Sequence, residues 1–297
     1  MVLSMQPASP PDTKREPVTD VYHDVQVVDA YRWLEDFQRE DVRRWSQAQN
    51  KHARNFLKRL PNRAASRARV EEVLADESAS YGAVAPAGGH IFAMKRQPPK
   101  QQPFLIVLAN LRDAKSARIL VDPEQIDDEG TTKIDWFVPS PDGELVAVSL
   151  SRRGTESGDV HIFRTEDGKR VHEIIPRVNG GTAGGDLAWL PDSSGFFYTR
   201  YPRGDERPAE DRDFFQQVYR HRLGEPTEKD HYELGKGLPR IAEIQLDADP
   251  RTGGLLATVQ DGRVLLAGRS SVRSLALETG AVTWMDVPLP AGGSPAG

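Results

Sequence analysis

The chain has 297 residues, of which 38% are hydrophobic and 28% are charged, and its formal net charge is −5 at pH 7. This composition is typical of a soluble globular protein, and the negative charge gives no general attraction to nucleic acid or to anionic membranes. The longest apolar runs, such as residues 104–109, are too short to span a bilayer, and the lack of cysteine excludes disulfides and thiolate metal sites and fits a reducing, cytoplasmic compartment.

The first part of the chain is expected to be helical after a loose start. Residues 1–20 are proline-rich and polar, without the basic and apolar regions of a signal peptide, and we expect a flexible lead-in. Residues 21–78 are predicted to form a helical segment. Apolar residues recur at three- and four-residue steps over residues 38–60, which predicts an amphipathic helix that ends at Pro61. A second helix is expected after it, with an apolar side of Val70, Val73 and Leu74.

The same segment carries a run of positive charge. Nine basic residues and no acidic residue lie between Arg43 and Arg69. Such a helix can bind nucleic acid, but it can equally be a solvated face whose partner is an acidic protein surface. We favour the second interpretation because no nucleic-acid recognition motif accompanies the charge.

Residues 79–287 are predicted to be a partial β-propeller. Four fragments, beginning at Pro86, Ser140, Leu190 and Asp247, each combine a tight turn with a β-prone strand. Their turn acids Asp142, Asp192 and Asp249 are spaced by 192 − 142 = 50 and 249 − 192 = 57 residues. This period is typical of propeller blades.

One repeat can be divided into its strands. "KIDWFVPS", "ELVAVSLS", "DVHIFRT" and "RVHEIIP" predict four antiparallel strands, with Asp-Gly turns at residues 142–143 and 167–168. The fold class is therefore mainly β, with about four blades of four antiparallel strands after an α-helical N-terminal segment. Roughly the last 35 residues fit the pattern less well, and residues 288–297 are expected to be a disordered tail.

A group of motifs near the start resembles the N-terminal signature of the prolyl oligopeptidase family of serine peptidases. The matching residues are Tyr22, His23, Asp29, Tyr31, Arg32, Trp33, Leu34, Glu35, Asp36, Trp45, Gln49 and Asn50. Asp24 and Ala30 stand where the family usually has glycine and proline. The segments "SPDGELVAVSLSRRGTESGDVHIF", "LAWLPDSSGFFYTRYP" and "FFQQVYRHRLGEPTEKD" resemble successive propeller segments of the family, so the likeness covers roughly residues 15–260.

The resemblance implies a structural role for the signature. In the family, the N-terminal segment wraps onto an α/β-hydrolase domain, and the complete enzyme cleaves short proline-containing peptides after proline. This implies domain docking by Tyr31, Arg32, Trp33, Leu34, Glu35, Asp36 and Trp45. Tryptophan suits docking because it buries a large area and still offers an N–H donor. The alternative is that these residues cap the propeller or their own two helices.

The catalytic machinery of the family is not found in the sequence. The G-x-S-x-G pattern of a nucleophile elbow does not occur. The nearest imitation, "GGSPAG" at residues 292–297, places Pro295 after Ser294, and proline has no N–H to offer an oxyanion. The seven histidines form no H-E-x-x-H pair, and no phosphate-binding or dinucleotide motif is present. We therefore predict no catalytic, cofactor-binding or metal-binding residue, and neither a nucleic-acid nor a membrane partner.

Three hypotheses follow from this combination. The chain is expected to be the N-terminal and propeller part of a prolyl oligopeptidase-like serine endopeptidase, inactive alone, with the resemblance ending through a frameshift near Asp261 and Gly262. Alternatively, it is a stand-alone propeller that binds peptides or a protein. The third possibility is a split peptidase whose hydrolase domain is a separate chain.

Overall fold

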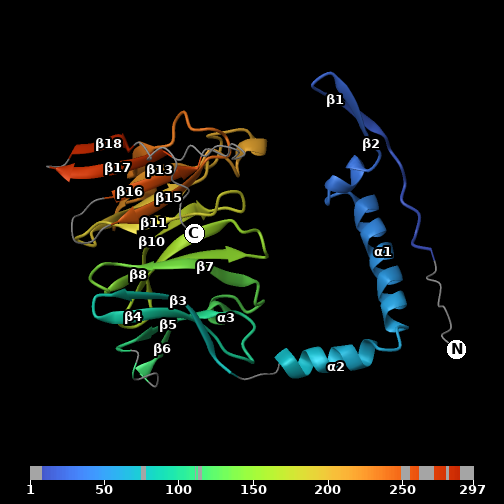
Figure 1. Ribbon diagram of the computed structural model, residues 1–297, viewed down its shortest axis with the longest axis horizontal. Coiled ribbons are helices and arrows are strands. Elements are labelled where there is room, and N and C mark those ends of the chain that lie inside the picture. Colours follow the sequence, from blue (N-terminus) through green and yellow to red (C-terminus); the bar gives the residue numbers. More distant parts are fainter. Residues whose placement is uncertain are drawn as a thin grey trace. The chain divides into compact units, whose positions relative to one another are not determined.

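The computed structural model describes residues 9–74, 78–110, 112, 116–248, 255–260, 271–278 and 281–287. The chain divides into two compact units, residues 1–76 and residues 77–297. The two long helices belong to the first unit and most of the strands to the second (Figure 1). The predicted tail, residues 288–297, and the turn acid Asp249 lie outside the described residues.

A β-hairpin opens the first unit. It consists of β1, Val18–Tyr22, and β2, Val25–Asp29, paired antiparallel. The two turn residues, His23 and Asp24, have φ angles of 50° and 64°. Positive φ at both positions matches the right-handed twist of hairpin strands, and aspartate tolerates this conformation better than most residues. We expected a loose lead-in through residue 20, whereas the structure has the strand begin at Val18.

Helices follow the hairpin. A short 3-10 helix, η1, Arg32–Glu35, precedes α1, Glu40–Lys58, and α2, Arg63–Leu74. Pro61 lies between the two α-helices, where the residue before a proline avoids the α conformation. Helix α2 buries none of its residues. The apolar side of α2 is therefore not covered by the described residues. This matters because a helix of this length gains most of its stability from packing.

The second unit contains four four-stranded antiparallel sheets, one after another along the chain (Figure 1). The first sheet is β3 Ser80–Ala87, β4 His90–Arg96, β5 Phe104–Leu108 and β6 Arg118–Val121. The second is β7 Thr132–Pro139, β8 Leu145–Arg152, β9 Gly158–Arg164 and β10 Arg170–Asn179. The third is β11 Leu187–Trp189, β12 Gly195–Arg200, β13 Gln217–Arg222 and β14 His231–Leu234. The fourth is β15 Glu243–Ala248, β16 Leu255–Gln260, β17 Ser271–Glu278 and β18 Ala281–Val287.

These sheets are the four blades that the turn spacing predicted. Each blade pairs neighbouring strands in sequence order, as a propeller blade does. Short helices lie in the connections, namely α3 Pro123–Ile126, η3 Ala209–Asp211 and η4 Thr227–Lys229. Asp122 caps α3 by accepting a hydrogen bond of 3.2 Å from the backbone N–H of Glu124.

Three of the four hydrophobic clusters of the described residues lie between adjacent blades, and the fourth is formed by residues of the first blade. On β8, Val146 and Val148 pack toward the first blade, whereas Ala147 packs toward the third. On β12, Phe196 faces the second blade and Phe197 the fourth. Successive strand residues point to opposite faces, so a central strand that is covered on both sides must be apolar throughout. A single blade would therefore leave two apolar faces exposed.

The tight turns of adjacent blades also touch. Gly88 lies in the β3–β4 turn with a φ of +53°, and a Cβ added there would lie 1.8 Å from the carbonyl oxygen of Asp142. Asp142 belongs to the β7–β8 turn, and its backbone N–H donates to Ser193 Oγ of the β11–β12 turn over 3.4 Å. Glycine is thus required at residue 88 by a close approach between two backbones.

Candidate functional site

The two signature tryptophans contact each other inside the first unit. The rings of Trp33 and Trp45 are 6.4 Å apart at an interplanar angle of 77°, an edge-to-face arrangement. The guanidinium of Arg39 lies 5.8 Å from the Trp33 ring. Trp33 is only 8% exposed. The pair therefore forms a small local core between η1 and α1.

The same side chains bind the segment that precedes the hairpin. Trp33 Nε1 donates to the carbonyl oxygen of Lys14 over 2.9 Å, and Trp45 Nε1 donates to Thr13 Oγ1 over 3.0 Å. One turn further along α1, Gln49 Nε2 donates to the carbonyl oxygen of Pro11 over 2.8 Å. Residues 11–14 are thus held against α1, although composition alone suggested a loose segment there.

A charged contact fixes the base of the hairpin. The guanidinium of Arg32 donates to Asp20 of β1 and lies 3.5 Å from Asp29 of β2. This hydrogen bond from Arg32 lowers the pKa of Asp20, and the pKa of Arg32 is raised in turn. Arg32 therefore ties η1 to both strands of the hairpin.

The other signature residues occupy the surface or its edge. Tyr31, Glu35 and Asp36 are exposed, and Leu34 is partly buried. Asp36 Oδ1 accepts a hydrogen bond of 2.9 Å from the backbone N–H of Gln38, which shapes the entry to α1. The structure thus brings Trp33, Trp45 and Arg32 into internal contacts. It leaves Tyr31 available to a partner, and the docking role of the set stays a prediction.

The hairpin exposes several apolar side chains, and the sequence reasoning did not identify this surface. Its exposed apolar side chains are Val18, Val21, Tyr22, Val25, Val27 and Val28. Phe37, just after η1, is 75% exposed. Exposed apolar side chains gathered in one element of this kind are a candidate interaction site. The signal was present in "VTDVYHDVQVVD", in which valines recur on both faces of a short strand pair.

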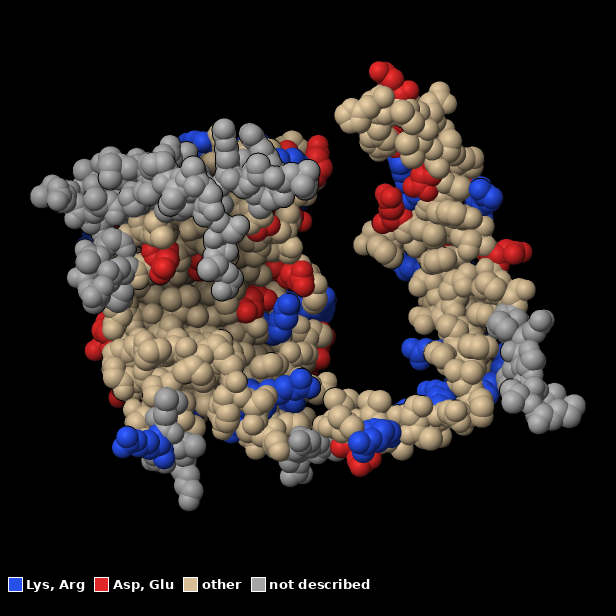
Figure 2. Space-filling model, in the orientation of Figure 1, with Lys and Arg blue, Asp and Glu red and all other residues tan. Residues whose placement is uncertain are grey.

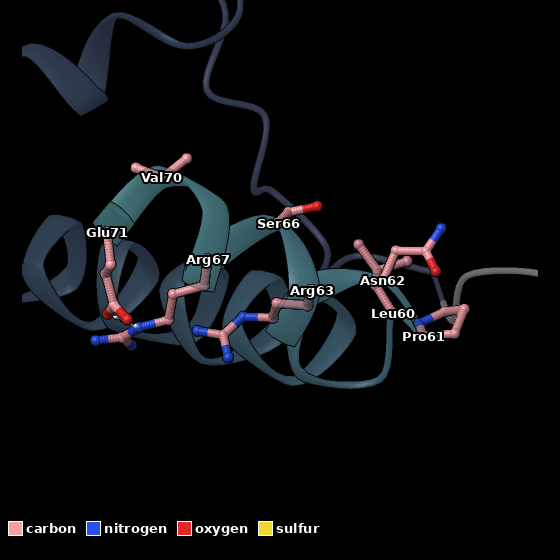
Figure 3. A pocket seen from close by; sticks show the side chains of 8 residues that line it. All are labelled: Leu60, Pro61, Asn62, Arg63, Ser66, Arg67, Val70 and Glu71. Atoms are coloured by element: carbon pink, nitrogen blue, oxygen red, sulfur yellow. Dashed lines mark hydrogen bonds and ion pairs between the residues drawn. The ribbon is translucent and has the colours of Figure 1, made fainter. Parts of the chain in front are cut away.

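A second apolar surface lies at the elbow between α1 and α2. A hollow of about 710 Å³ is lined by Leu60, Pro61, Asn62, Arg63, Ser66, Arg67, Val70 and Glu71 (Figure 3). Val70, Val73 and Leu74 are all more than half exposed. We name Val70, Val73, Leu74, Leu57 and Leu60 the elbow surface.

Positive charge borders the elbow surface. Figure 2 shows Lys and Arg side chains along this unit. Three of its arginines have acidic partners on their own helix, in the pairs Arg44–Glu40, Arg67–Glu71 and Arg69–Glu72. Pairs this exposed contribute little stability, so the cations are available to a partner.

The described residues contain no group of three or more histidine, aspartate or glutamate side chains that could hold a metal ion. No described helix is long and apolar enough to cross a membrane. Ser294 lies outside the described residues.

Comparison with known proteins places both units in one family. The model of the prolyl oligopeptidase N-terminal beta-propeller domain matches residues 10–243. A prolyl endopeptidase of Elizabethkingia meningoseptica is 29% identical over 229 residues, which is 76% of this chain and 31% of the relative. Prolyl oligopeptidase A of Galerina marginata is 25% identical over 256 residues, 75% of this chain and 34% of the relative. The chain thus spans about a third of the length of these curated relatives.

Solved structures agree with this placement. A structure from a study of two prolyl endopeptidases and their inter-domain dynamics has a TM-score of 0.77 at 25% identity, covering 93% of this chain and 39% of that one. Prolyl oligopeptidase B of Galerina marginata, bound to a 35-residue hydrolysis and macrocyclization substrate, also has a TM-score of 0.77, at 19% identity. That match covers 96% of this chain and 42% of that one, and it shows the shared fold.

Proposed function

Because this chain belongs to the prolyl oligopeptidase family through its N-terminal β-propeller domain, we propose that it is the docking and propeller part of a proline-specific serine peptidase. The family resemblance drawn from the sequence is confirmed by the match over residues 10–243. In this proposal the first unit binds an α/β-hydrolase domain, and the blades limit access to short peptides. The nucleophile is supplied by that hydrolase domain.

The observation that carries the docking role is the exposed apolar hairpin. A two-stranded hairpin is marginal in water on its own, and here its valines are exposed on both faces. Arg32 holds its base in place from within the unit, and Trp33 holds the segment that precedes it. A fixed, apolar and uncovered hairpin is suited to burial against a second domain. Trp33 and Trp45 contribute by rigidity rather than by direct contact.

We expect these 297 residues to be inactive alone. No serine in the sequence has the flanking glycines of a nucleophile elbow. Cleavage would then depend on a hydrolase domain, joined either in cis or as a separate chain. A stand-alone binding propeller is the competing function, and it predicts tight peptide binding without that domain.

The test is reconstitution. The 297-residue chain is mixed with the separately expressed hydrolase domain of the Elizabethkingia meningoseptica prolyl endopeptidase. Association is measured by analytical ultracentrifugation, and cleavage of a Gly-Pro-linked chromogenic peptide is followed. We expect association, and cleavage that increases when the chain is added. Peptide binding by the chain alone, without association, would instead support the stand-alone propeller.

A matched pair of variants locates the contact. Val21→Asp places a charge on the apolar hairpin, and Thr19→Asp places the same charge on a polar position of the same strand. Loss of one buried valine contact costs about 1.5 kcal/mol, which is roughly tenfold in Kd. We expect Val21→Asp to weaken association by at least that factor and Thr19→Asp to change it little. Equal effects of the two variants would remove the hairpin from the interface.

A further inference from the structure

A buried histidine lies at the seam between the second and third blades. His221, on β13, has a side chain that is 0% exposed. Its ring lies 5.2 Å from the ring of Phe196 on the neighbouring strand β12. Neither the family assignment nor the proposed docking role uses this residue.

Both ring nitrogens of His221 face carboxylates. Nδ1 lies 2.6 Å from Asp230 Oδ1, just before β14 in the same blade. Nε2 contacts Glu173 Oε1, on β10 of the second blade. A neutral imidazole has one donor and one acceptor nitrogen, whereas an ionised carboxylate can only accept. Two carboxylate partners therefore favour the imidazolium form, which donates from both nitrogens.

Strand β10 has a β-bulge at Glu173, whose carboxylate contacts His221 of the third blade. Val171 pairs with Ile162, and Ile175 pairs with Val160. Between these two pairs β10 advances by four residues and β9 by only two, so β10 contains a β-bulge. His172, inside this bulge, has a φ of +61°. Bulges of this kind redirect side chains, and here the redirected carboxylate is part of the blade contact.

The remaining polar groups of the cluster extend the network. Asp230 Oδ2 accepts from the hydroxyl of Tyr198 on β12 over 2.5 Å. Arg203 donates to the Tyr198 hydroxyl over 3.3 Å and to the carbonyl oxygen of Pro176 on β10 over 2.7 Å. Glu173, Asp230, Tyr198 and Arg203 are thus the titratable and charged groups around His221 in this seam. Burial alone would lower the pKa of His221, but its two carboxylate partners raise it.

We propose that His221 is a protonation-dependent clamp between the second and third blades, closed while the imidazolium bridges Glu173 and Asp230 and released when it loses its proton. Loss of that proton leaves Nε2 or Nδ1 without a hydrogen to donate. A carboxylate and a nitrogen lone pair then face each other in a buried seam, which is unfavourable.

The sign of the pH dependence follows from the raised pKa. The open form binds the proton with an ordinary pKa near 6.5, and the closed form binds it more tightly. Between these two pKa values, opening releases one proton, so the opening constant rises about tenfold per pH unit. The clamp is fully effective below pH 6.5 and is lost as pH rises through the pKa of the closed form.

Hydrogen exchange of the 297-residue chain tests this proposal. We expect the protection factors of backbone amides in β10 and β13, already corrected for intrinsic exchange, to fall about tenfold per pH unit above pH 6.5. Histidine NMR at pH 6.5 should show both ring nitrogens of His221 protonated. Protection factors that do not change with pH, or a neutral ring at pH 6.5, would overturn the proposal.

Two variants and one control separate the clamp from general packing. In Glu173→Gln, which leaves the side chain's size unchanged at a partly exposed position, the fall should again begin near pH 6.5 but end at lower pH, so that its total size is smaller. In His221→Gln it should disappear. His231→Gln removes an exposed histidine whose Nδ1 lies 3.3 Å from Glu233, and it should leave the slope intact. A fall in Glu173→Gln that covers the same pH range and has the same total size as in the parent chain would refute the clamp even if His221→Gln did not fold.

Discussion

The contact between turns of adjacent blades can be tested with two neighbouring glycines. Gly88 and Gly89 form the β3–β4 turn, and both have positive φ, +53° and +77°. An alanine Cβ at residue 88 would lie 1.8 Å from the Asp142 carbonyl oxygen, whereas at residue 89 it would meet no atom within 4 Å. Replacement by alanine therefore introduces backbone strain at both positions but a steric clash only at residue 88.

The magnitudes follow from these two terms. Left-handed backbone costs an L-residue about 1 kcal/mol, and this cost applies to both variants. At residue 88 the two turns must also separate by about an ångström, and overpacking of this kind adds roughly 1–3 kcal/mol. For a unit of this size, 1 kcal/mol corresponds to about 3 °C in Tm. We expect Gly89→Ala to lower Tm by about 3 °C and Gly88→Ala by about 10 °C.

Thermal unfolding followed by tryptophan fluorescence measures the difference, because Trp136 and Trp189 lie in the second and third blades. Gly143→Ala, on the other side of the contact, should resemble Gly88→Ala, since its Cβ would lie 2.7 Å from the carbonyl oxygen of Ala87. If Gly88→Ala and Gly89→Ala had the same Tm, the turns would not be in close contact, and the reasoning about the blade seam would fail.

Two further predictions concern single side chains. Trp33→Phe keeps the ring contact with Trp45 but removes the N–H that donates to the Lys14 carbonyl oxygen. Loss of this hydrogen bond costs about 1 kcal/mol, so limited proteolysis within residues 9–17 should become roughly fivefold faster. An unchanged cleavage rate would show that the hydrogen bond does not hold this segment. Burial lowers the pKa of His161 to about 4, below its ordinary value of 6.5, so its neutral form is favoured by folding. The difference in free energy of unfolding between the parent chain and His161→Gln should therefore be constant above pH 6.5. As pH falls from 6.5 toward 4, the parent chain should lose stability relative to the variant, as measured by urea unfolding.

The blades were predictable because their signals are local. Asp-Gly turns and short β-prone runs identify strands within one repeat, and the 50-residue spacing identifies the repeat itself. The helices α1 and α2 were predicted for the same reason. Their apolar periodicity and the proline that separates them, Pro61, are both visible within a short stretch of sequence.

The missed features depend on geometry that a local pattern does not contain. The hairpin turn uses His23 and Asp24 instead of the asparagine-glycine pair that usually marks such turns. The start of the hairpin was therefore assigned to the lead-in, and its remainder to the segment predicted to be helical. The contact of Glu173 with His221 joins residues 48 positions apart through a bulge. The docking residues could be named from resemblance, but the sequence did not separate internal residues such as Trp33 from exposed ones such as Tyr31.

The way in which α1 binds the preceding segment affects how freely that segment can change during evolution. Trp33 and Gln49 donate to backbone carbonyl oxygens, at Lys14 and Pro11, and every amino acid supplies that acceptor. Only the Trp45 contact requires a particular side chain, the hydroxyl of Thr13. Positions 11 and 14 can therefore accumulate substitutions without loss of attachment, whereas position 13 tolerates only serine or another side chain with an acceptor oxygen.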